Sequence, residues 1–235
     1  MQLEEIQIIG FVASQNTQLC GLFSLGHEKV LIDVGLKSFV NPNQEWHNRD
    51  DVYVILAMQN DTPVGGIKLE NRIVGKELNC ELLIKPVVKN ISEIIDNQSW
   101  GIIGEAGSLW HDKSMANKNL SQILGRTIIG VAEFAKVNCV LSLNGKHTYR
   151  MARDVGSQIF RKIGEDGYLH FDVGAFDKDQ WSSALFFQND LKKLSRASQD
   201  ARDFIKSIRQ NPECRTVIKT DAASFKINFN LAVSV

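Results

Sequence analysis

The chain has 235 residues, of which 43% are hydrophobic and 23% charged, values that are ordinary for a globular protein with one large core. Its 27 basic and 27 acidic residues balance, so the net charge gives no indication of nucleic acid or an anionic membrane as a partner. The acidic start MQLEEIQIIG does not resemble a signal peptide, and no apolar run reaches the length of a membrane span. We therefore expect a cytoplasmic protein.

The four cysteines are spread widely along the chain. Cys20, Cys80, Cys139 and Cys214 lie about 60 or more residues apart and form no C-x-x-C pair. This spacing supports neither a disulfide framework nor a metal site, and it fits a reduced compartment. Nothing else in the composition indicates a metal or a permanently bound cofactor.

The first part of the chain predicts helices followed by a β-hairpin. Apolar residues at helical spacing predict short helices over 16–25 and 27–34, separated at Gly26, with His27 as a polar residue at a helix end. In the polar loop that follows, Trp46 is expected to plug the core rather than line a pocket. Residues 51–58 and 63–70 alternate around the turn Asn60-Asp61, and both alternating sets are largely apolar. This pattern predicts an antiparallel hairpin that is covered on both faces.

The stretch 101–136 organises the rest of the chain. An alternating run over 78–84 and a short helix at 91–95 lead to a predicted strand at 102–110, a polar loop and an amphipathic helix over 120–136. Glu105 is the carboxylate inside the apolar part of this strand. A helix start that faces the end of a strand is a ready anion site, which indicates a ligand bearing phosphate. An ordinary strand–helix corner without a ligand is the alternative.

The last part of the chain predicts two further strands, two helices and a closing strand. The patterns indicate a strand at 139–143, a helix at 147–163 capped by Gly164, a strand at 168–173, one long or broken helix over 177–210 and a strand at 225–233. There is no repeat and no obvious linker. We expect a single domain over 1–235, with a core at about 45–175 and a C-terminal elaboration at 176–235.

The order strand, polar loop, helix and strand resembles the GNAT acyltransferase superfamily. The resemblance implies an α+β fold with a mixed, mostly antiparallel twisted sheet and helices on both faces. It also implies a catalytic glutamate at Glu105 and a loop (typically R-x-x-G-x-G/A) whose backbone holds the pyrophosphate of coenzyme A. The residues that this implies for binding the acyl donor are Leu109, Trp110, Asn117, Lys118, Asn119, Leu120 and Ser121. A structural carboxylate, hydrogen-bonded to a neighbouring loop, is the other interpretation of Glu105.

Part of the chain also resembles the acyl-homoserine-lactone synthases within that superfamily. The matching pieces are Asp51-Val52-Tyr53-Val54, Gly65-Gly66-Ile67-Lys68-Leu69 and Glu105-Ala106-Gly107-Ser108-Leu109. Val54, Lys68 and Ser108 stand where that family has an aspartate and two arginines, so homoserine-lactone chemistry is not expected. Tyr53, Lys68 and Ser108 are the residues implied to bind the acceptor.

These resemblances imply an N-acyltransferase that moves an acyl group from acyl-coenzyme A or acyl carrier protein to a small-molecule amine. The helix predicted over 147–163 resembles a family motif in which a tyrosine often protonates the departing thiolate. Phe160 occupies that place and cannot donate a proton, so Tyr168 is the next candidate after Glu105 for a catalytic role. The alternative is a GNAT-fold ligand-binding or regulatory module that has lost turnover. The sequence carries no indication of an oligomeric state.

Overall fold

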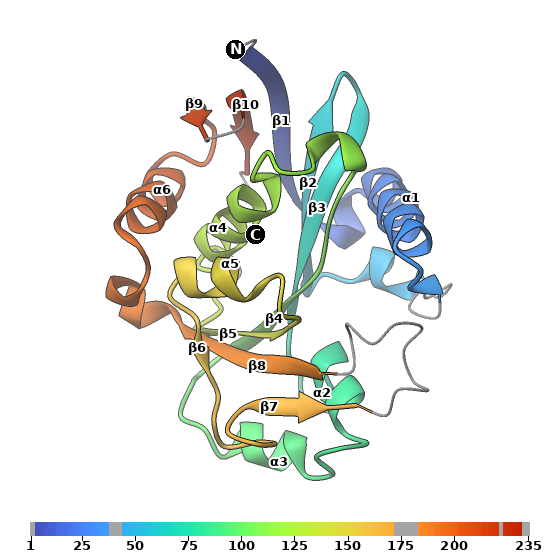
Figure 1. The fold of residues 1–235 in the computed structure, drawn as a ribbon, viewed down its shortest axis with the longest axis vertical. Helices are drawn as coiled ribbons and strands as arrows, with labels where there is room; N and C mark the ends of the chain where they lie inside the picture. Colours follow the sequence, from blue (N-terminus) through green and yellow to red (C-terminus); the bar gives the residue numbers. More distant parts are fainter. Residues whose placement is uncertain (1–2, 38–43, 172–182, 221–222, 232–235) are drawn as a thin grey trace.

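The computed structural model describes residues 3–37, 44–171, 183–220 and 223–231. Its strands form one sheet with the order β6-β8-β5-β4-β3-β2-β1-β10-β9, and β7 pairs with β8 (Figure 1). The strands are β1 Leu3–Val12, β2 Val52–Gln59, β3 Thr62–Asn71, β4 Ile103–His111, β5 Cys139–Asn144, β6 Gln158–Ile159, β7 Tyr168–His170, β8 Ser183–Asp190, β9 Arg215–Lys219 and β10 Ser224–Asn230. The described pairs are antiparallel except for β1–β10 and β4–β5. The mixed, mostly antiparallel sheet is confirmed.

Helices cover both faces of this sheet. The α-helices are α1 Thr17–Asp33, α2 Asn79–Ile84, α3 Ile91–Asp96, α4 Leu120–Val131, α5 Tyr149–Asp154 and α6 Gln199–Gln210. Short 3-10 helices are η1 Ala13–Gln15, η3 Glu45–Asn48, η4 Lys113–Met115 and η7 Leu191–Arg196. In Figure 1, α4, α5 and α6 lie on one side of the β1–β4 strands and α1 lies on the other. None of the helices in these ranges is both long enough and apolar enough to cross a membrane.

The predicted hairpin is confirmed and lies at the centre of the sheet. β2 pairs antiparallel with β3, and β3 pairs antiparallel with β4. Side chains on both faces of β2 are buried from Val52 to Met58. Tyr53, Ile55 and Ala57 pack in the cluster under α4, whereas Val52, Val54 and Leu56 pack with Phe23 of α1. Because a core lies on each face, the two alternating sets are both apolar.

The predicted break at Gly26 is wrong, because α1 runs unbroken from Thr17 to Asp33. The side chain of Asn16 accepts the Leu19 N–H at 3.0 Å and caps its start. A Cβ placed on Gly26 would lie 2.1 Å from the indole of Trp110. Gly26 therefore serves the close approach of α1 to β4 rather than a turn.

Three expected elements downstream of the hairpin differ from the structure. The alternating run at 78–84 contains the helix α2, in which Cys80 and Ile84 are buried at a helical spacing of four. The helix expected over 147–163 ends at Asp154; Gly156 follows with a φ of 88°, and β6 then pairs with β8. Residues 183–190 of the helix expected over 177–210 form β8, which pairs with β5 from Leu185 to Asp190. Residues 172–182 lie outside the described part.

The sheet also extends beyond the expected core on the N-terminal side. β1, for which no element is predicted above, buries Ile6 and Ile8 completely between more exposed neighbours. β10, predicted as the closing strand, lies parallel to β1, and β9 pairs with β10 at the edge. Strands from both ends of the chain thus enter the same sheet as the hairpin.

Candidate active site

The parallel pairing of β4 and β5 is short, and this positions the site. Only Ile103 to Glu105 of β4 pair with Cys139 to Leu141 of β5, although both described strands continue further. Figure 1 shows the consequence, since β1, β2 and β3 stand upright while β7 and β8 lie nearly across them. A cavity of about 1260 Å³ lies where the strands part. Its walls come from β3, β4 and β5 together with α1, α2, α4 and α5.

Beyond Glu105, β4 carries one extra residue relative to β3. Ser108 and Leu109 together face the single β3 residue Ile67, and Ser108 has a φ of 51°. A bulge of this kind leaves backbone groups outside the ladder and bends the strand. Ser108 and Leu109 both line the cavity. A backbone amide that the bulge leaves outside the ladder would be suited to polarise a carbonyl that enters the cavity.

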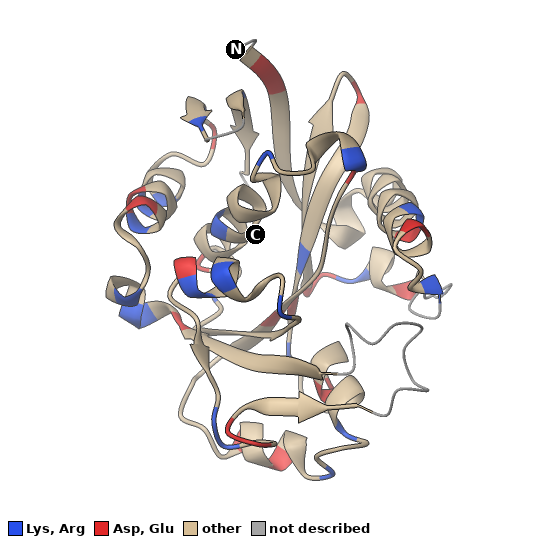
Figure 2. Cartoon of the chain, viewed as in Figure 1, with Lys and Arg blue, Asp and Glu red and all other residues tan. Residues whose placement is uncertain are grey.

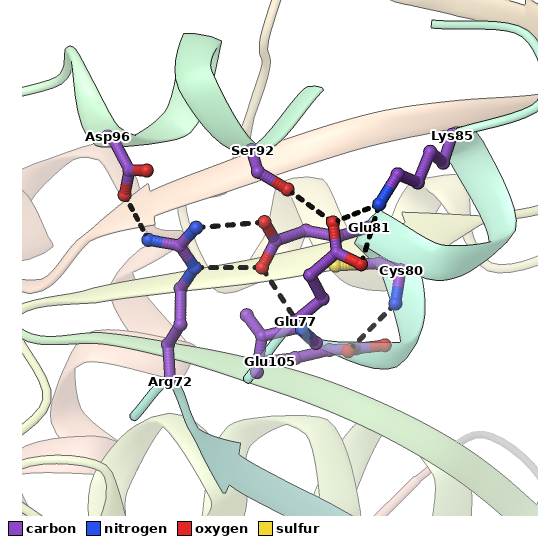
Figure 3. Close-up of polar contacts among 9 residues, drawn as sticks. Arg72, Glu77, Cys80, Glu81, Lys85, Ser92, Asp96 and Glu105 are labelled. Carbon is purple, nitrogen blue, oxygen red and sulfur yellow. Dashed lines mark hydrogen bonds and ion pairs between the residues drawn. The ribbon is translucent and has the colours of Figure 1, made fainter. Parts of the chain in front are cut away.

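Glu105 lies at the last parallel pair, where the strands separate. Its side chain is 8% exposed and lines the cavity. Burial, with a smaller contribution from the neighbouring Glu70, raises the pKa of this carboxyl to about 7, although the backbone N–H and the thiol of Cys80 and the charge of Lys68 act to lower it. The Cys80 N–H donates to Oε2 at 3.0 Å (Figure 3). A carboxylate with a pKa near neutrality is suited to accept a proton in the physiological range.

Lys68 brings a buried positive charge to the same cavity. Its side chain is 9% exposed, and Nζ lies 4.4 Å from the centre of the Trp46 ring. Burial lowers the pKa of this amine, and Glu70 and Glu105 partly oppose the effect. Among the described residues, no carboxylate lies within ion-pair distance of Nζ. The ammonium is therefore held by an aromatic face and free to contact a ligand.

Two further charged residues complete this wall. Glu70 stands directly across from Glu105 in the β3–β4 ladder and is 6% exposed. Arg49, in the segment before β2, pairs with both Glu70 and Asp51. Figure 2 shows that the strands are otherwise mostly uncharged, with the charges gathered on helices, loops and strand ends. A group of buried charges inside the sheet is thus a local feature of this cavity.

The loop before α4 has the backbone shape that glycines usually supply. Asn117 and Asn119 have φ values of 62° and 63°, and Asn is among the few non-glycine residues that adopt this left-handed region readily. Asn119 is the residue before the first turn of α4, and Ser121 in that turn lines the cavity. The predicted loop motif therefore lacks its glycines but retains a conformation they would adopt.

The other two residues of that loop motif point elsewhere. Lys118 forms an ion pair with Glu4 of β1 at 2.7 Å, and the Leu120 side chain is 1% exposed in the core under α4. Leu109 and Trp110, by contrast, line the cavity. Any contact of a ligand with residues 118 and 120 would therefore use their backbone.

No protein-family model and no curated protein sequence matches the chain. Solved structures do match it. An N-acyl amino acid synthase from uncultured soil microbes, FeeM, aligns over 84% of this chain and 98% of its own at 9% identity, with a TM-score of 0.51. The CoA-dependent acyl-homoserine lactone synthase MesI aligns over 87% and 95% at 10% identity and 0.54. An agmatine N-acetyltransferase aligns over 77% and 98% at 12% identity and 0.50.

The chain has the GNAT fold. The parting of β4 from β5 and the turn into α4 stand where the sequence resemblance to GNAT proteins predicted the catalytic strand and the loop. At these identities the likeness concerns the fold, and the chemistry has to be argued from the side chains of this chain.

Two tyrosines of the predicted GNAT site do not join the cavity. Tyr168 is 48% exposed on β7, and Tyr53 is 6% exposed within the core cluster under α4. Neither lines the cavity that contains Glu105. Phe160 is 3% exposed and packs edge-on against Trp100 and Phe186, so that position holds core packing.

Other cavity residues were missed or interpreted differently from sequence. His27 lies in the middle of α1, four residues after Phe23, and lines the cavity. Burial, with a smaller effect of Lys68, lowers its pKa to about 4, so the imidazole is neutral at pH 7. Trp46 packs edge-on against Phe23 at 5.8 Å and also lines the cavity. Trp46 therefore packs in the core, as expected, and also forms part of the cavity wall. The signal that could have identified His27 is the helical spacing itself. A helix predicted to continue through Gly26 places His27 on the same face as Phe23, four residues earlier.

Proposed function

We propose that this protein is an N-acyltransferase, which moves an acyl group from an acyl thioester to the amine of a small molecule. The observation that carries the proposal is the position of Glu105. A buried carboxylate with a pKa of about 7 lies where the two halves of the sheet part and the cavity passes between them. The similarity in fold to structures named as acyltransferases supports this reaction class.

In the proposed reaction the acceptor amine loses a proton to Glu105 and attacks the thioester carbonyl. A C–N bond forms, and the carbonyl oxygen becomes an oxyanion beside the bulge at Ser108 and Leu109. Collapse of this intermediate breaks the C–S bond and releases a thiolate, which takes up the proton held by Glu105 and becomes the free thiol. Glu105 precedes Ser108 and Leu109 on the same strand, so the base and the backbone amides that would stabilise the oxyanion line the same cavity.

A catalytically degenerate binding module is the second candidate, favoured by the phenylalanine at position 160. That residue packs in the core and cannot protonate a leaving group. A thiol, however, has a pKa of about 8.5 and departs readily as a thiolate. The missing phenol therefore weighs little against turnover.

The donor is proposed to enter from the α4 side. Ser121 and Gly125 of α4 and Met151 of α5 line that part of the cavity, and the phosphates of an acyl-coenzyme A would meet the backbone of 117–121. The name of MesI describes a CoA-dependent enzyme, which supports coenzyme A as the carrier. Acyl carrier protein is the other donor to test.

The acceptor is proposed to be an α-amino acid. Lys68 holds a nine-tenths buried ammonium without an ion-pair partner among the described residues, and burying an unpaired charge is costly. An acceptor carboxylate on Nζ would compensate this cost and leave the amine on the side of Glu105. FeeM is named as an N-acyl amino acid synthase, which supports the same acceptor class.

The test is thiol release from acetyl-, hexanoyl- and palmitoyl-coenzyme A and from acyl carrier protein. Each donor is offered amino acids and, as matched controls, the amines that lack only the carboxyl group. Release with amino acids and not with the matched amines is the expected result. No release with any pair, together with donor binding by calorimetry, would favour the binding module instead.

Lys68→Met gives the sharper form of this test. We expect the KM for the amino acid to rise by roughly 10- to 100-fold, as for a lost hydrogen bond between charged groups. The KM for the donor thioester should stay within a few-fold. An equal effect on amino acids and on matched amines would show that Lys68 does not contact the carboxylate.

A further inference from the structure

The short helix α2 stands against the proposed base from outside the sheet. Residues 72–97, between β3 and β4, contain α2 and α3, and α2 contributes the backbone N–H of Cys80 to Glu105 (Figure 3). The Cys80 thiol is fully buried and also hydrogen-bonds to Glu105. The position of the first turn of α2 therefore determines how many hydrogen bonds the Glu105 carboxylate accepts.

An ion pair behind α2 fixes that turn. Glu81 is 0% exposed, and its Oε2 accepts the Leu78 N–H at 3.0 Å. Arg72 contacts both oxygens of Glu81, with Nε at 2.8 Å from Oε2 and a terminal nitrogen at 3.0 Å from Oε1. Arg72 also pairs with Asp96 of α3. A bidentate pair of this kind fixes geometry as well as charge.

Arg72 itself is anchored to the catalytic strand. It follows β3 directly, and its backbone N–H donates to the Ile103 carbonyl of β4 at 2.8 Å. Contacts therefore run from β4 to Arg72, from Arg72 to Glu81 of α2, and from Cys80 of α2 back to Glu105 of β4. A second pair, Lys85 with Glu77, joins the residues that flank the two ends of α2 at 2.9 Å and has no direct contact with Glu105.

We propose that Arg72 and Glu81 are positioning residues for Glu105, holding the first turn of α2 so that the Cys80 N–H stays on the carboxylate. This inference rests on the proposed function only in giving Glu105 a catalytic role. The groups that face Glu105 are Glu70 and Lys68 from β3, Cys80 from α2 and the apolar Leu141 from β5. Burial and Glu70 favour the protonated acid, so the two donors of Cys80, together with the charge of Lys68, keep a carboxylate accessible near neutral pH.

The test compares Glu81→Gln with Glu77→Gln. Glu81→Gln retains the shape but weakens the hold of Arg72 on α2, and we expect the pKa of Glu105 to rise by about one unit, as for a weakened hydrogen bond to a carboxylate. The acid limb of the pH–rate profile should move by the same amount, with the limiting rate at high pH retained. Glu77→Gln disrupts the pair that flanks the same helix and should leave the profile unmoved. If Glu81→Gln does not fold, Asp96→Asn takes its place in the test. It removes the exposed partner of Arg72 and should raise the pKa of Glu105 by a smaller amount.

A direct readout keeps this inference separate from the proposed function. The pKa of Glu105 is measured by NMR titration of protein with glutamate labelled at the carboxyl carbon, and Glu105→Gln assigns the resonance. A raised pKa in Glu81→Gln and Asp96→Asn, but not in Glu77→Gln, supports positioning even in the absence of detectable turnover. An unchanged pKa in the first two variants, or an equal shift in all three, overturns it.

Discussion

Replacing Glu105 by glutamine removes the proposed base and leaves an oxygen that accepts the Cys80 N–H. The side chain keeps its shape inside the cavity wall. If Glu105 takes the proton from the acceptor amine, the transfer rate at pH 8 should fall about 10²- to 10⁴-fold. The binding of the donor thioester should hardly change, because the carboxylate lies on the side of the cavity where the acceptor is proposed to bind.

The same substitution should stabilise the fold at high pH. The pKa of Glu105 rises from 4.5 to about 7 on folding, so the folded protein holds this proton more tightly than the unfolded chain. The resulting stability is fully present below pH 4.5 and is lost as the pH rises through 7, and the shift corresponds to roughly 3 kcal/mol. Glutamine carries no proton to lose. Glu105→Gln should therefore melt roughly 5–10 °C above the wild type at pH 8, with a much smaller difference at pH 5.

Melting curves at pH 5 and pH 8, together with the thiol-release assay, check both effects on one variant. Glu93→Gln, an exposed change on α3, is the control and should alter neither quantity. If Glu105→Gln instead melts lower at pH 8 and keeps its turnover within a few-fold, then Glu105 is a structural carboxylate and the reasoning from its burial is refuted.

Two further substitutions test the packing and the donor side. Gly26→Ala should destabilise by about 1–3 kcal/mol because its Cβ would meet the Trp110 indole, whereas Gly21→Ala in the same helix meets nothing within 4 Å and should stabilise it slightly; equal melting temperatures would contradict the close approach. Ser121→Glu should weaken binding of coenzyme A more than about tenfold relative to Ser121→Gln, since it adds a negative charge where the phosphates are proposed to lie. Equal affinities by calorimetry would place the phosphates elsewhere.

The centre of the fold was predictable because its local patterns agree with its tertiary environment. The hairpin of β2 and β3 alternates cleanly, and both faces are covered, as two apolar sets require. Glu105 stood out because a lone carboxylate inside an apolar strand has to be accounted for by function or hydrogen bonding. The left-handed asparagines before α4 likewise supply what the missing glycines would have supplied.

The elements that were wrong share an ambiguity in their apolar pattern. In α2 the spacing of Cys80 and Ile84 satisfies both a strand period of two and a helix step of four. β8 contains the continuous run Ala184 to Phe187, which is buried on both faces and carries no period at all. Only pairing with β5 on one side and β6 and β7 on the other makes it a strand.

The candidate site was predictable only in part because its side chains meet through tertiary structure. Arg49, Glu70 and His27 come from three segments, and no local motif joins them. Burial of the site also means that the property useful for catalysis lowers the stability of the fold. Covering Glu105 with α2 and β5 raises its pKa into the useful range, and the same covering costs stability once the carboxylate is ionised. The paired charges of Arg72 and Glu81 hold the covering helix in place against that cost, so we expect the part of the chain between β3 and β4 to control both the stability of the fold and the pH at which the base becomes available.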